Sequence, residues 1–88
     1  MPNKQYKAIV KFGKNDKITQ KSFLEAMNGA RLIQVSQEWI DIWYKDDTIY
    51  NPNEYENSIV LHNDEELERF KLVMKTFFSE ILYQIDAL

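Results

Sequence analysis

Few residues in this sequence have the types and spacings that catalysis requires. His62 is the only histidine and cysteine is absent, which excludes a two-histidine metal site, a thiolate nucleophile and a disulfide. The two glycines are too few for a phosphate-binding loop or a dinucleotide fingerprint. No serine lies in a nucleophile motif. We therefore predict that the protein is not an enzyme, that it holds no cofactor, and that His62 is a structural residue packing over Leu67.

Carboxylates are the other candidates for chemistry. Asp46, Asp47, Glu54 and Glu56 lie close in sequence and offer the oxygen ligands that a hard cation prefers. Their spacing does not match a calcium-binding loop, and the glycine that such a loop needs for its turn is missing. No metal site is predicted from them.

A combination of aromatic and acidic residues in the middle of the chain is more informative. Five of the twelve aromatic residues lie between Trp39 and Tyr55, and tryptophan and tyrosine are enriched at the energetic centres of protein interfaces. The expected function is non-catalytic binding of another protein, as a regulatory or inhibitor-like module. The predicted partner-binding residues are Trp39, Asp41, Trp43, Asp46, Asp47, Tyr50, Glu54, Tyr55 and Glu56.

The formal net charge of −3 conceals two segments of opposite sign. Residues 1–31 contain seven basic and two acidic residues, whereas residues 38–68 contain ten acidic residues and one basic residue, Lys45. Ten carboxylates in one segment fit a mimic of nucleic acid that competes for a basic cleft on a protein. The other interpretation is that the two segments lie beside each other in the fold and partly neutralise.

The alternative function is nucleic-acid binding by the lysine-rich segment. A basic patch there would contact phosphates, and its members are Lys4, Lys7, Lys11, Lys14, Lys17 and Lys21. Residues 19–43 also permit a helix-turn-helix, but Glu38 and Asp41 would repel phosphates from its second helix. The negative net charge likewise argues against direct DNA binding.

The elements that position these residues follow from hydrophobic periodicity. Residues 6–12 alternate between the two faces of a half-buried strand. Thr19 is expected to cap a short helix, and Asn28-Gly29 to end it in a left-handed conformation. The β-branched and aromatic residues that follow predict strands at 31–36, 39–44 and 48–50, with a last short strand at Ser58–Leu61.

Two features of this central region stay open. Residues 31–44 also fit one long bent strand with a bulge. In the strand at 39–44, alternation puts Trp39, Asp41 and Trp43 on one face and Ile40 and Ile42 on the other. If the helices cover the isoleucine face, the two tryptophans line the open side of the sheet; the reverse arrangement would bury them.

The last quarter of the chain predicts one long amphipathic helix from Asn63 to Leu88. Asn63 and Glu66 have the spacing of a capping box, and Glu65 precedes Arg69 by four residues, which suits an ion pair. The apolar stripe of this helix comprises Leu67, Phe70, Met74, Phe77, Phe78, Ile81, Ile85 and Leu88.

Such a helix would be about 36 Å long, which exceeds the expected width of a domain of this size. Its last apolar residues would lack partners within the chain, so we expect a two-fold homodimer through Ile81, Ile85 and Leu88. The alternatives are a sheet wide enough to cover the whole stripe, or a frayed last turn.

Together these elements predict a single α+β domain spanning residues 1–88. It has a small, mostly antiparallel sheet of four to five strands, with a short helix and a long C-terminal helix packed on one face, in the order β-α-β-β-β-β-α. If strands 6–12 and 31–36 pair in parallel, the crossover between them should be right-handed. No stretch is long and apolar enough to span a membrane and no signal-peptide run begins the chain, so a cytoplasmic location is expected.

In composition the chain resembles the small accessory proteins of phages and mobile elements from AT-rich bacteria, including anti-CRISPR and other inhibitor proteins. The resemblance rests on size, the absence of cysteine, the acidic bias and the usage of Lys, Asn, Ile and Tyr, with no motif behind it. It implies an acidic surface that competes with nucleic acid for a basic groove on a host protein.

Overall fold

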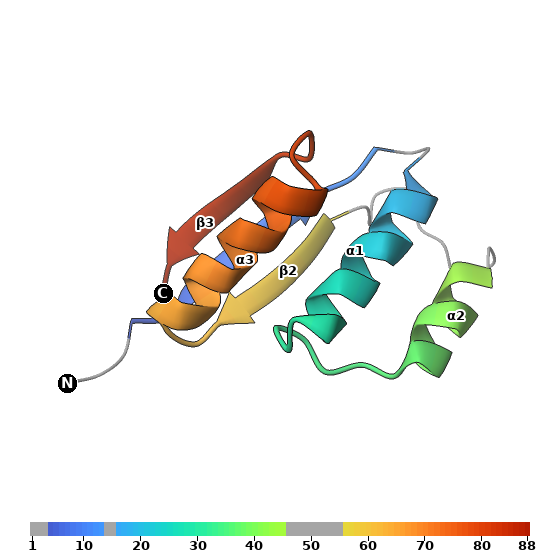
Figure 1. The fold of residues 1–88 in the computed structure, drawn as a ribbon, viewed down its shortest axis with the longest axis horizontal. Helices are drawn as coiled ribbons and strands as arrows, with labels where there is room; N and C mark the ends of the chain where they lie inside the picture. The colour runs from blue at the N-terminus through green and yellow to red at the C-terminus, as the bar shows by residue number, and fades with distance from the viewer. Residues whose placement is uncertain (1–3, 14–15, 46–55) are drawn as a thin grey trace.

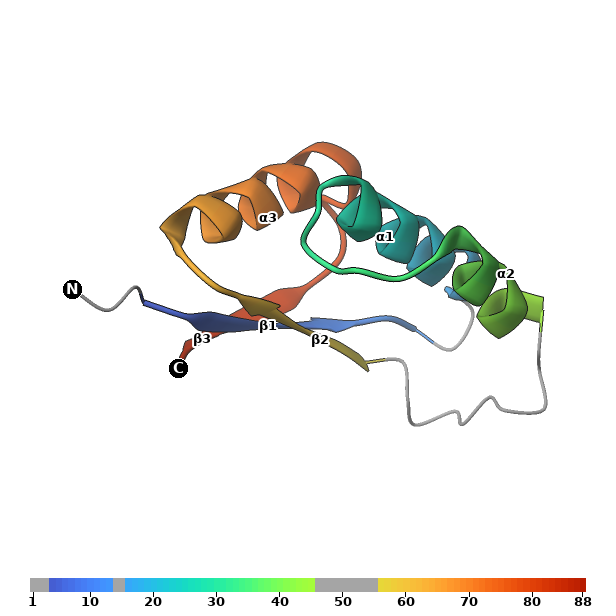
Figure 2. The same ribbon diagram turned by 90° about the horizontal axis from the view of Figure 1, so that it is seen from below.

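A three-stranded antiparallel sheet with helices on one face forms the domain. The structure is a computed structural model that describes residues 4–13, 16–45 and 56–88. Its elements are β1 (Tyr6–Lys11), α1 (Lys17–Gly29), α2 (Gln37–Lys45), β2 (Glu56–Leu61), α3 (Asp64–Phe77) and β3 (Tyr83–Ala87), as drawn in Figure 1. The strand order is β2-β1-β3, and Figure 2 shows the described helices together on one side of the sheet.

Strand β1 is central because both other strands pair with it. Its register places Ala8 opposite Ile59 of β2 and opposite Ile85 of β3. Ala8 and Val10 are fully buried beneath the helices, whereas the intervening residues point to the opposite face of the sheet. The strand predicted at residues 6–12 is confirmed, and the one predicted at Ser58–Leu61 lies within β2.

The strands predicted at 31–36 and 39–44 are wrong, as is the single bent strand over the same residues. Residues 37–45 form helix α2 instead, so the parallel crossover does not exist either. Ser36 caps this helix, because its Oγ accepts a hydrogen bond from the Trp39 N–H at 3.0 Å. The strand predicted at 48–50 lies outside the described residues.

The predicted long C-terminal helix is also wrong in its second half. Helix α3 ends at Phe77, and Phe78 turns its ring into the core, where its centroid lies 5.9 Å from that of Phe23. The chain then returns as β3, which pairs with the second side of β1. The class is α+β, but the sheet has three strands rather than four to five, and the order is β-α-α-β-α-β.

Helix α1 differs from expectation at both of its ends. It begins before Thr19, which is therefore not its cap. Its left-handed residue is Arg31, with a φ of 60°, rather than Gly29. The Leu32 N–H donates to the Met27 carbonyl at 2.9 Å, so the helix ends in a Schellman-type turn with both of these apolar side chains buried.

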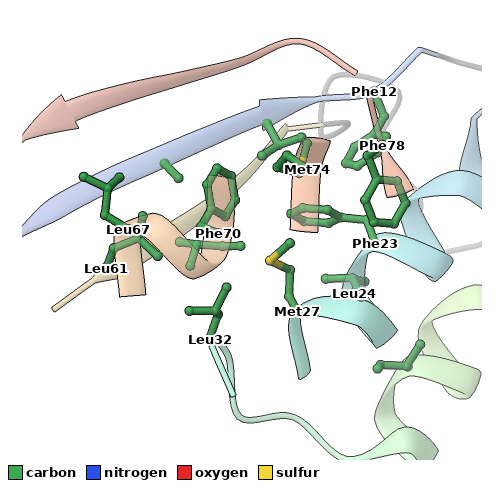
Figure 3. Packing of buried hydrophobic residues seen from close by; sticks show 14 residues of the cluster. Phe12, Phe23, Leu24, Met27, Leu32, Leu61, Leu67, Phe70, Met74 and Phe78 are labelled. Atoms are coloured by element: carbon green, nitrogen blue, oxygen red, sulfur yellow. The ribbon is translucent and has the colours of Figure 1, made fainter. Parts of the chain in front are cut away.

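The core lies between the sheet and the helices (Figure 3). Phe23 of α1 lies at its centre, with its ring centroid 5.3 Å from that of Phe12. Phe70 of α3 meets Tyr83 of β3 edge to face at 5.2 Å. The largest fully buried side chains are Phe23, Phe70, Met27, Ile40, Leu61, Met74 and Val10.

The last residues of the predicted apolar stripe differ in burial from the expectation. Phe77, predicted to be buried, is 72% exposed. Ile81 and Ile85 are half-buried and pack against the core of their own chain, while Leu88 is exposed. Neither the overhanging helix nor the unpartnered isoleucines that motivated the expected homodimer occur among the described residues.

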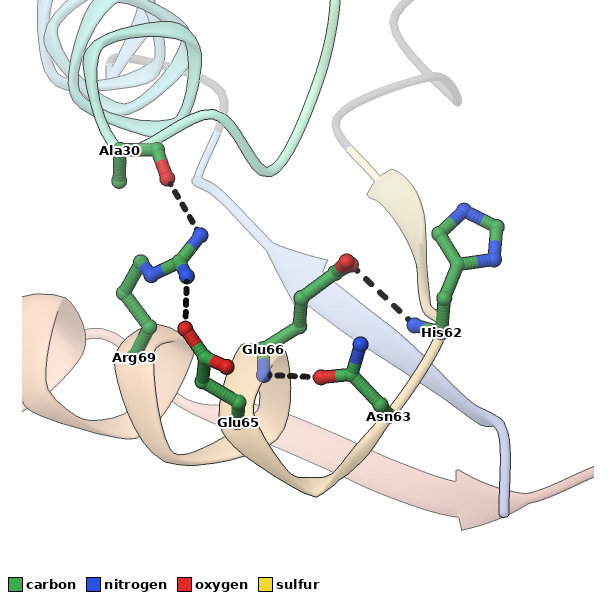
Figure 4. Close-up of polar contacts among 6 residues, drawn as sticks. All are labelled: Ala30, His62, Asn63, Glu65, Glu66 and Arg69. Atoms are coloured by element: carbon green, nitrogen blue, oxygen red, sulfur yellow. Dashed lines mark hydrogen bonds and ion pairs between the residues drawn. The ribbon is translucent and has the colours of Figure 1, made fainter. Parts of the chain in front are cut away.

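The start of α3 confirms the predicted Asn63 cap and the ion pair, while Glu66 bonds the N–H of His62 rather than that of Asn63 (Figure 4). Asn63 Oδ1 accepts a hydrogen bond from the Glu66 N–H at 2.8 Å, and the Glu66 carboxylate accepts one from the His62 N–H at 3.2 Å. Arg69 pairs with Glu65 at 2.9 Å and donates a second hydrogen bond to the Ala30 carbonyl at 3.0 Å. This arginine therefore connects α3 to the end of α1.

We expect Asn63→Ala to lower the free energy of unfolding by about 1 kcal/mol, because the Glu66 N–H loses its acceptor. Urea denaturation measures this change. Asn63→Asp is the control, since it keeps an acceptor oxygen at the same position and should keep most of the stability. Equal losses in the two variants would show that the cap bond is not the stabilising contact.

Candidate functional site

Helix α2 carries the aromatic residues on which the sequence analysis centred. One side of this helix is anchored to the domain, because Ile40 is fully buried in the core. Gln37 Nε2 donates hydrogen bonds to Glu25 of α1 at 2.8 Å and to Asp41 at 3.0 Å. Lys21 of α1 lies 3.8 Å from the Asp41 carboxylate. The helix is therefore held in place by the buried Ile40, by half-buried Trp43, which packs against the core, and by a small polar network with α1.

Cations of α1 also lie over the aromatic rings of α2. Lys17 Nζ is 5.8 Å from the ring centroid of Trp43 and 5.5 Å from that of Tyr44, and Lys21 Nζ is 5.0 Å from the Tyr44 ring. Such contacts favour the observed docking by roughly 0.5 to 1 kcal/mol each at exposed sites. Trp43 and Tyr44 are both half-buried.

The opposite side of α2 is apolar and exposed. Trp39 is 49% exposed and Ile42 is 57% exposed. They are three residues apart, which places them as neighbours on one side of the helix, and half-buried Trp43 adjoins Trp39 one turn on. We call Trp39, Ile42 and Trp43 the outer strip of α2.

The four predicted site residues that the structure describes do not all lie on one surface. Trp39 and Trp43 share a helix side, but Asp41 is turned toward α1 and is engaged by Lys21. Glu56 lies on β2, where it pairs with Lys11 across the sheet at 3.9 Å. Asp46, Asp47, Tyr50, Glu54 and Tyr55 lie outside the described residues.

Ile42 was not predicted to be a surface residue, because residues 39–44 were expected to form a strand. In a strand, residues two apart share a face, which groups Ile42 with Ile40. On a helix, two residues correspond to roughly 200° of rotation, so Ile42 faces away from the buried Ile40. Ser36 was the available signal, since a serine before an amphipathic run marks a helix start.

The charged segments do lie partly beside each other. Lys11 pairs with Glu56, and Lys21 with Asp41, so two members of the lysine-rich segment contact carboxylates of the acidic one. Exposed pairs of this kind stabilise weakly, but they reduce the charge that either side offers to a ligand. Of the other described carboxylates of the acidic segment, Glu38 lies at the start of α2, and the rest gather at the start of α3, at the opposite end of the molecule from α2 (Figure 1).

Titratable groups outside α2 offer little chemistry. The Tyr6 hydroxyl donates a hydrogen bond to Asp64 at 2.7 Å, and this bond to a carboxylate raises the pKa of the exposed phenol. His62 is exposed, and its ring points away from Asn63 and Glu66 (Figure 4). Within residues 4–13, 16–45 and 56–88, no group of three or more potential metal-ligating side chains occurs. No helix in these ranges is long and apolar enough to cross a membrane.

A second apolar surface lies between α1 and α3. It is a groove lined by Ser22, Ala26, Ala30, Val73, Phe77 and Phe78. The small side chains of α1 leave space beside the exposed ring of Phe77. This groove has no polar network comparable to the one beneath α2, and neither acidic nor basic groups line it.

Comparison with known proteins gives no relative from which a function can be transferred. A scan against protein-family models finds no match, and searches of curated proteins and of solved structures also find none.

Proposed function

We propose that the protein binds another protein, without catalysing a reaction, through the outer strip of α2. The observation that carries this proposal is the pairing of Trp39 and Ile42, both about half exposed on a helix that is anchored from behind by fully buried Ile40. Large apolar side chains held on a fixed helix have already lost part of their conformational entropy, which lowers the cost of binding. Tryptophan is also among the residues that most often dominate binding energy.

The spacing of the outer strip favours one mode of recognition. Trp39, Ile42 and Trp43 stand at positions i, i+3 and i+4, the spacing with which an amphipathic helix inserts into an apolar groove. The expected partner is therefore a protein with an apolar groove of about two helical turns. Glu38 lies at the start of α2 and Lys45 at its end, so the two ends of the helix carry charges of opposite sign.

The described charges give less support to the other candidate functions. A nucleic-acid mimic needs its carboxylates on one surface, whereas those of α2 and those at the start of α3 lie at opposite ends of the molecule (Figure 1). A nucleic-acid-binding patch needs lysines that can contact phosphates, whereas Lys11 and Lys21 contact carboxylates and Lys21 also lies over Tyr44. The inhibitor-like role remains part of the proposal as binding that blocks a partner's groove.

The test is a quantitative pull-down with the full chain as bait, using lysate of the cells from which the sequence comes. Trp39→Ala is expected to weaken capture of the partner by roughly thirtyfold, the effect of losing about 2 kcal/mol at a hot spot. Ile42→Asp should have a similar effect, because it places a charge in the proposed interface.

Leu72→Ala is the matched control, since Leu72 is 63% exposed on α3, away from the outer strip. It should leave capture unchanged, and circular dichroism should show all three variants folded. If Trp39→Ala and Leu72→Ala retain the same proteins equally well, the outer strip is not the binding surface. Salt-sensitive, micromolar binding of DNA or RNA by the wild type would instead support the lysine-rich segment.

A further inference from the structure

Strand β3 forms one margin of the sheet, and its backbone has an unused side. Figure 1 shows β3 at this margin, with α3 lying over the sheet rather than across the outer edge of β3. Among the described residues, β3 pairs only with β1. Sheet edges of this kind are templates for pairing with another strand unless charges, prolines or bulges protect them. The sequence of β3 contains no proline, and its one charged residue is Asp86.

The hydrogen-bond pattern identifies which backbone groups face outward. The Leu88 N–H donates to the Gln5 carbonyl at 2.8 Å, and these two residues continue the register in which Tyr6 lies opposite Ala87. Opposed residues in an antiparallel pair alternate between bonded and non-bonded. Gln84 and Asp86 therefore direct their backbone groups toward β1, as Leu88 does. Tyr83, Ile85 and Ala87 direct theirs away from the sheet.

This alternation permits two copies of β3 to pair around a two-fold axis at Ile85. In that register, Ile85 lies opposite Ile85 of the second copy, and Tyr83 lies opposite Ala87. These are the residues whose N–H and C=O groups point outward, so each opposed pair can exchange two hydrogen bonds. In a register shifted by one residue, backbone groups that already bond to β1 would lie opposite the second copy, and the hydrogen bonds between the two β3 strands would be lost.

The side chains are self-complementary in the same register. On the face without helices, Gln84 lies opposite Asp86 of the second copy, and the Gln84 amide already donates to the Asp86 carboxylate within its own strand at 3.0 Å. Leu82, 84% exposed, lies opposite Leu88, 67% exposed. On the helix side, the bulky Tyr83 meets the small Ala87. No like charges lie directly opposite each other in this arrangement.

We infer that the protein forms a two-fold dimer by antiparallel pairing of its β3 strands, which joins the two sheets into one continuous sheet. The occupant of the β3 edge is a second copy of this chain, because the register satisfies the outward backbone groups and the side-chain pairs at the same time. The interface is isologous and closed, so it forms dimers rather than filaments. It lies apart from the outer strip of α2, and its test does not depend on the proposed function.

The first test measures mass by sedimentation velocity or light scattering from micromolar to hundreds of micromolar protein. The measured mass of the wild-type protein should rise from that of one chain toward that of two chains as the protein concentration rises. Gln84→Glu should weaken the dimer by about tenfold or more, because it opposes carboxylates across the axis twice, and Gln84→Lys should strengthen it by a similar factor through two ion pairs with Asp86. Both substitutions are at an exposed residue.

Ser58→Glu and Ser58→Lys are the matched controls. Ser58 and Gln84 are the two residues opposite Ile9 on the two edge strands, and both are exposed on the face without helices. The Ser58 variants should leave dimerisation unchanged. Ala87→Pro removes one outward N–H at a residue that does not pair its backbone with β1, and it should also weaken the dimer.

The second test locates the interface by residue-resolved amide exchange. Protection of the Tyr83, Ile85 and Ala87 amides should increase with protein concentration, whereas the Gln84 and Asp86 amides should be protected throughout. A single-chain mass over the whole concentration range, for both the wild type and Gln84→Lys, overturns the inference. A dimer that responds to Trp39→Ala but to neither Gln84 variant overturns it as well.

Discussion

Phe70→Ala is expected to lower the free energy of unfolding by about 3–5 kcal/mol, because it empties a fully buried aromatic site beneath α3. The ring also lies edge-on to Tyr83, so the truncation removes a contact between α3 and β3. Domains of this size have total stabilities of about 5–15 kcal/mol, so a large share would be lost. Urea or thermal denaturation followed by circular dichroism measures the change.

Phe77→Ala is the matched control, since it makes the same substitution on the same helix. Phe77 is 72% exposed, so its truncation should cost less than about 1 kcal/mol. The two phenylalanines are seven residues, or about two turns, apart and project from nearly the same side of α3, but Phe77 is the last residue of the helix and its ring is exposed. Similar losses at both positions would mean that α3 buries Phe77 in solution and continues beyond its observed end.

Ile40→Ala is expected to cost about 2–5 kcal/mol and to loosen α2 in particular, because Ile40 is the one fully buried side chain of this helix. The other contacts of α2 are half-buried Trp43, which packs against the core, and exposed or half-buried polar and cation–π contacts with α1, which stabilise weakly. Hydrogen exchange should therefore rise in residues 37–45 more than in α3. Partner capture should fall as well, because a mobile α2 must be ordered again on binding.

Ile42→Ala provides the control for this experiment. It makes the same substitution on the same helix, but Ile42 is 57% exposed, so the free energy of unfolding should change by less than about 1 kcal/mol. Hydrogen exchange in α2 should stay close to that of the wild type. If both isoleucine variants destabilise equally, residues 37–45 bury two isoleucines that are two positions apart, as a strand would.

The sequence identified the aromatic residues of the candidate site but not their arrangement. Trp39 and Trp43 were grouped on one side correctly. Residues four apart share a face in a strand, and on a helix four residues make about one turn, so both geometries place the two tryptophans together. Asp41 and Ile42 were assigned to the wrong sides, since the two geometries disagree at separations of two and three residues. The outer strip is therefore a product of the helical conformation of α2.

Local sequence by itself determined β1, most of β2, the presence of helix α1 but not its ends, and the start of α3. Each of these has a signal that is complete within a few residues: alternation in β1, and the Asn63 and Glu66 cap at α3. The helix start at Ser36 had such a signal as well, but the β-branched and aromatic residues after it favoured a strand on propensity alone. The preference of these residues for a strand is weak, and side-chain packing readily overrides it.

The end of α3, the position of β3 and the conformation of residues 37–45 were decided by the tertiary structure. From Ile81 to Leu88 the apolar residues fit a helix as well as a strand, because Ile81, Ile85 and Leu88 recur at helical spacing while Tyr83, Ile85 and Ala87 alternate. What selects the strand is the central position of β1, whose second side needs backbone partners, together with the space that Phe78 fills beside Phe23. These requirements arise between segments more than fifty residues apart, so no local pattern in either segment contains them.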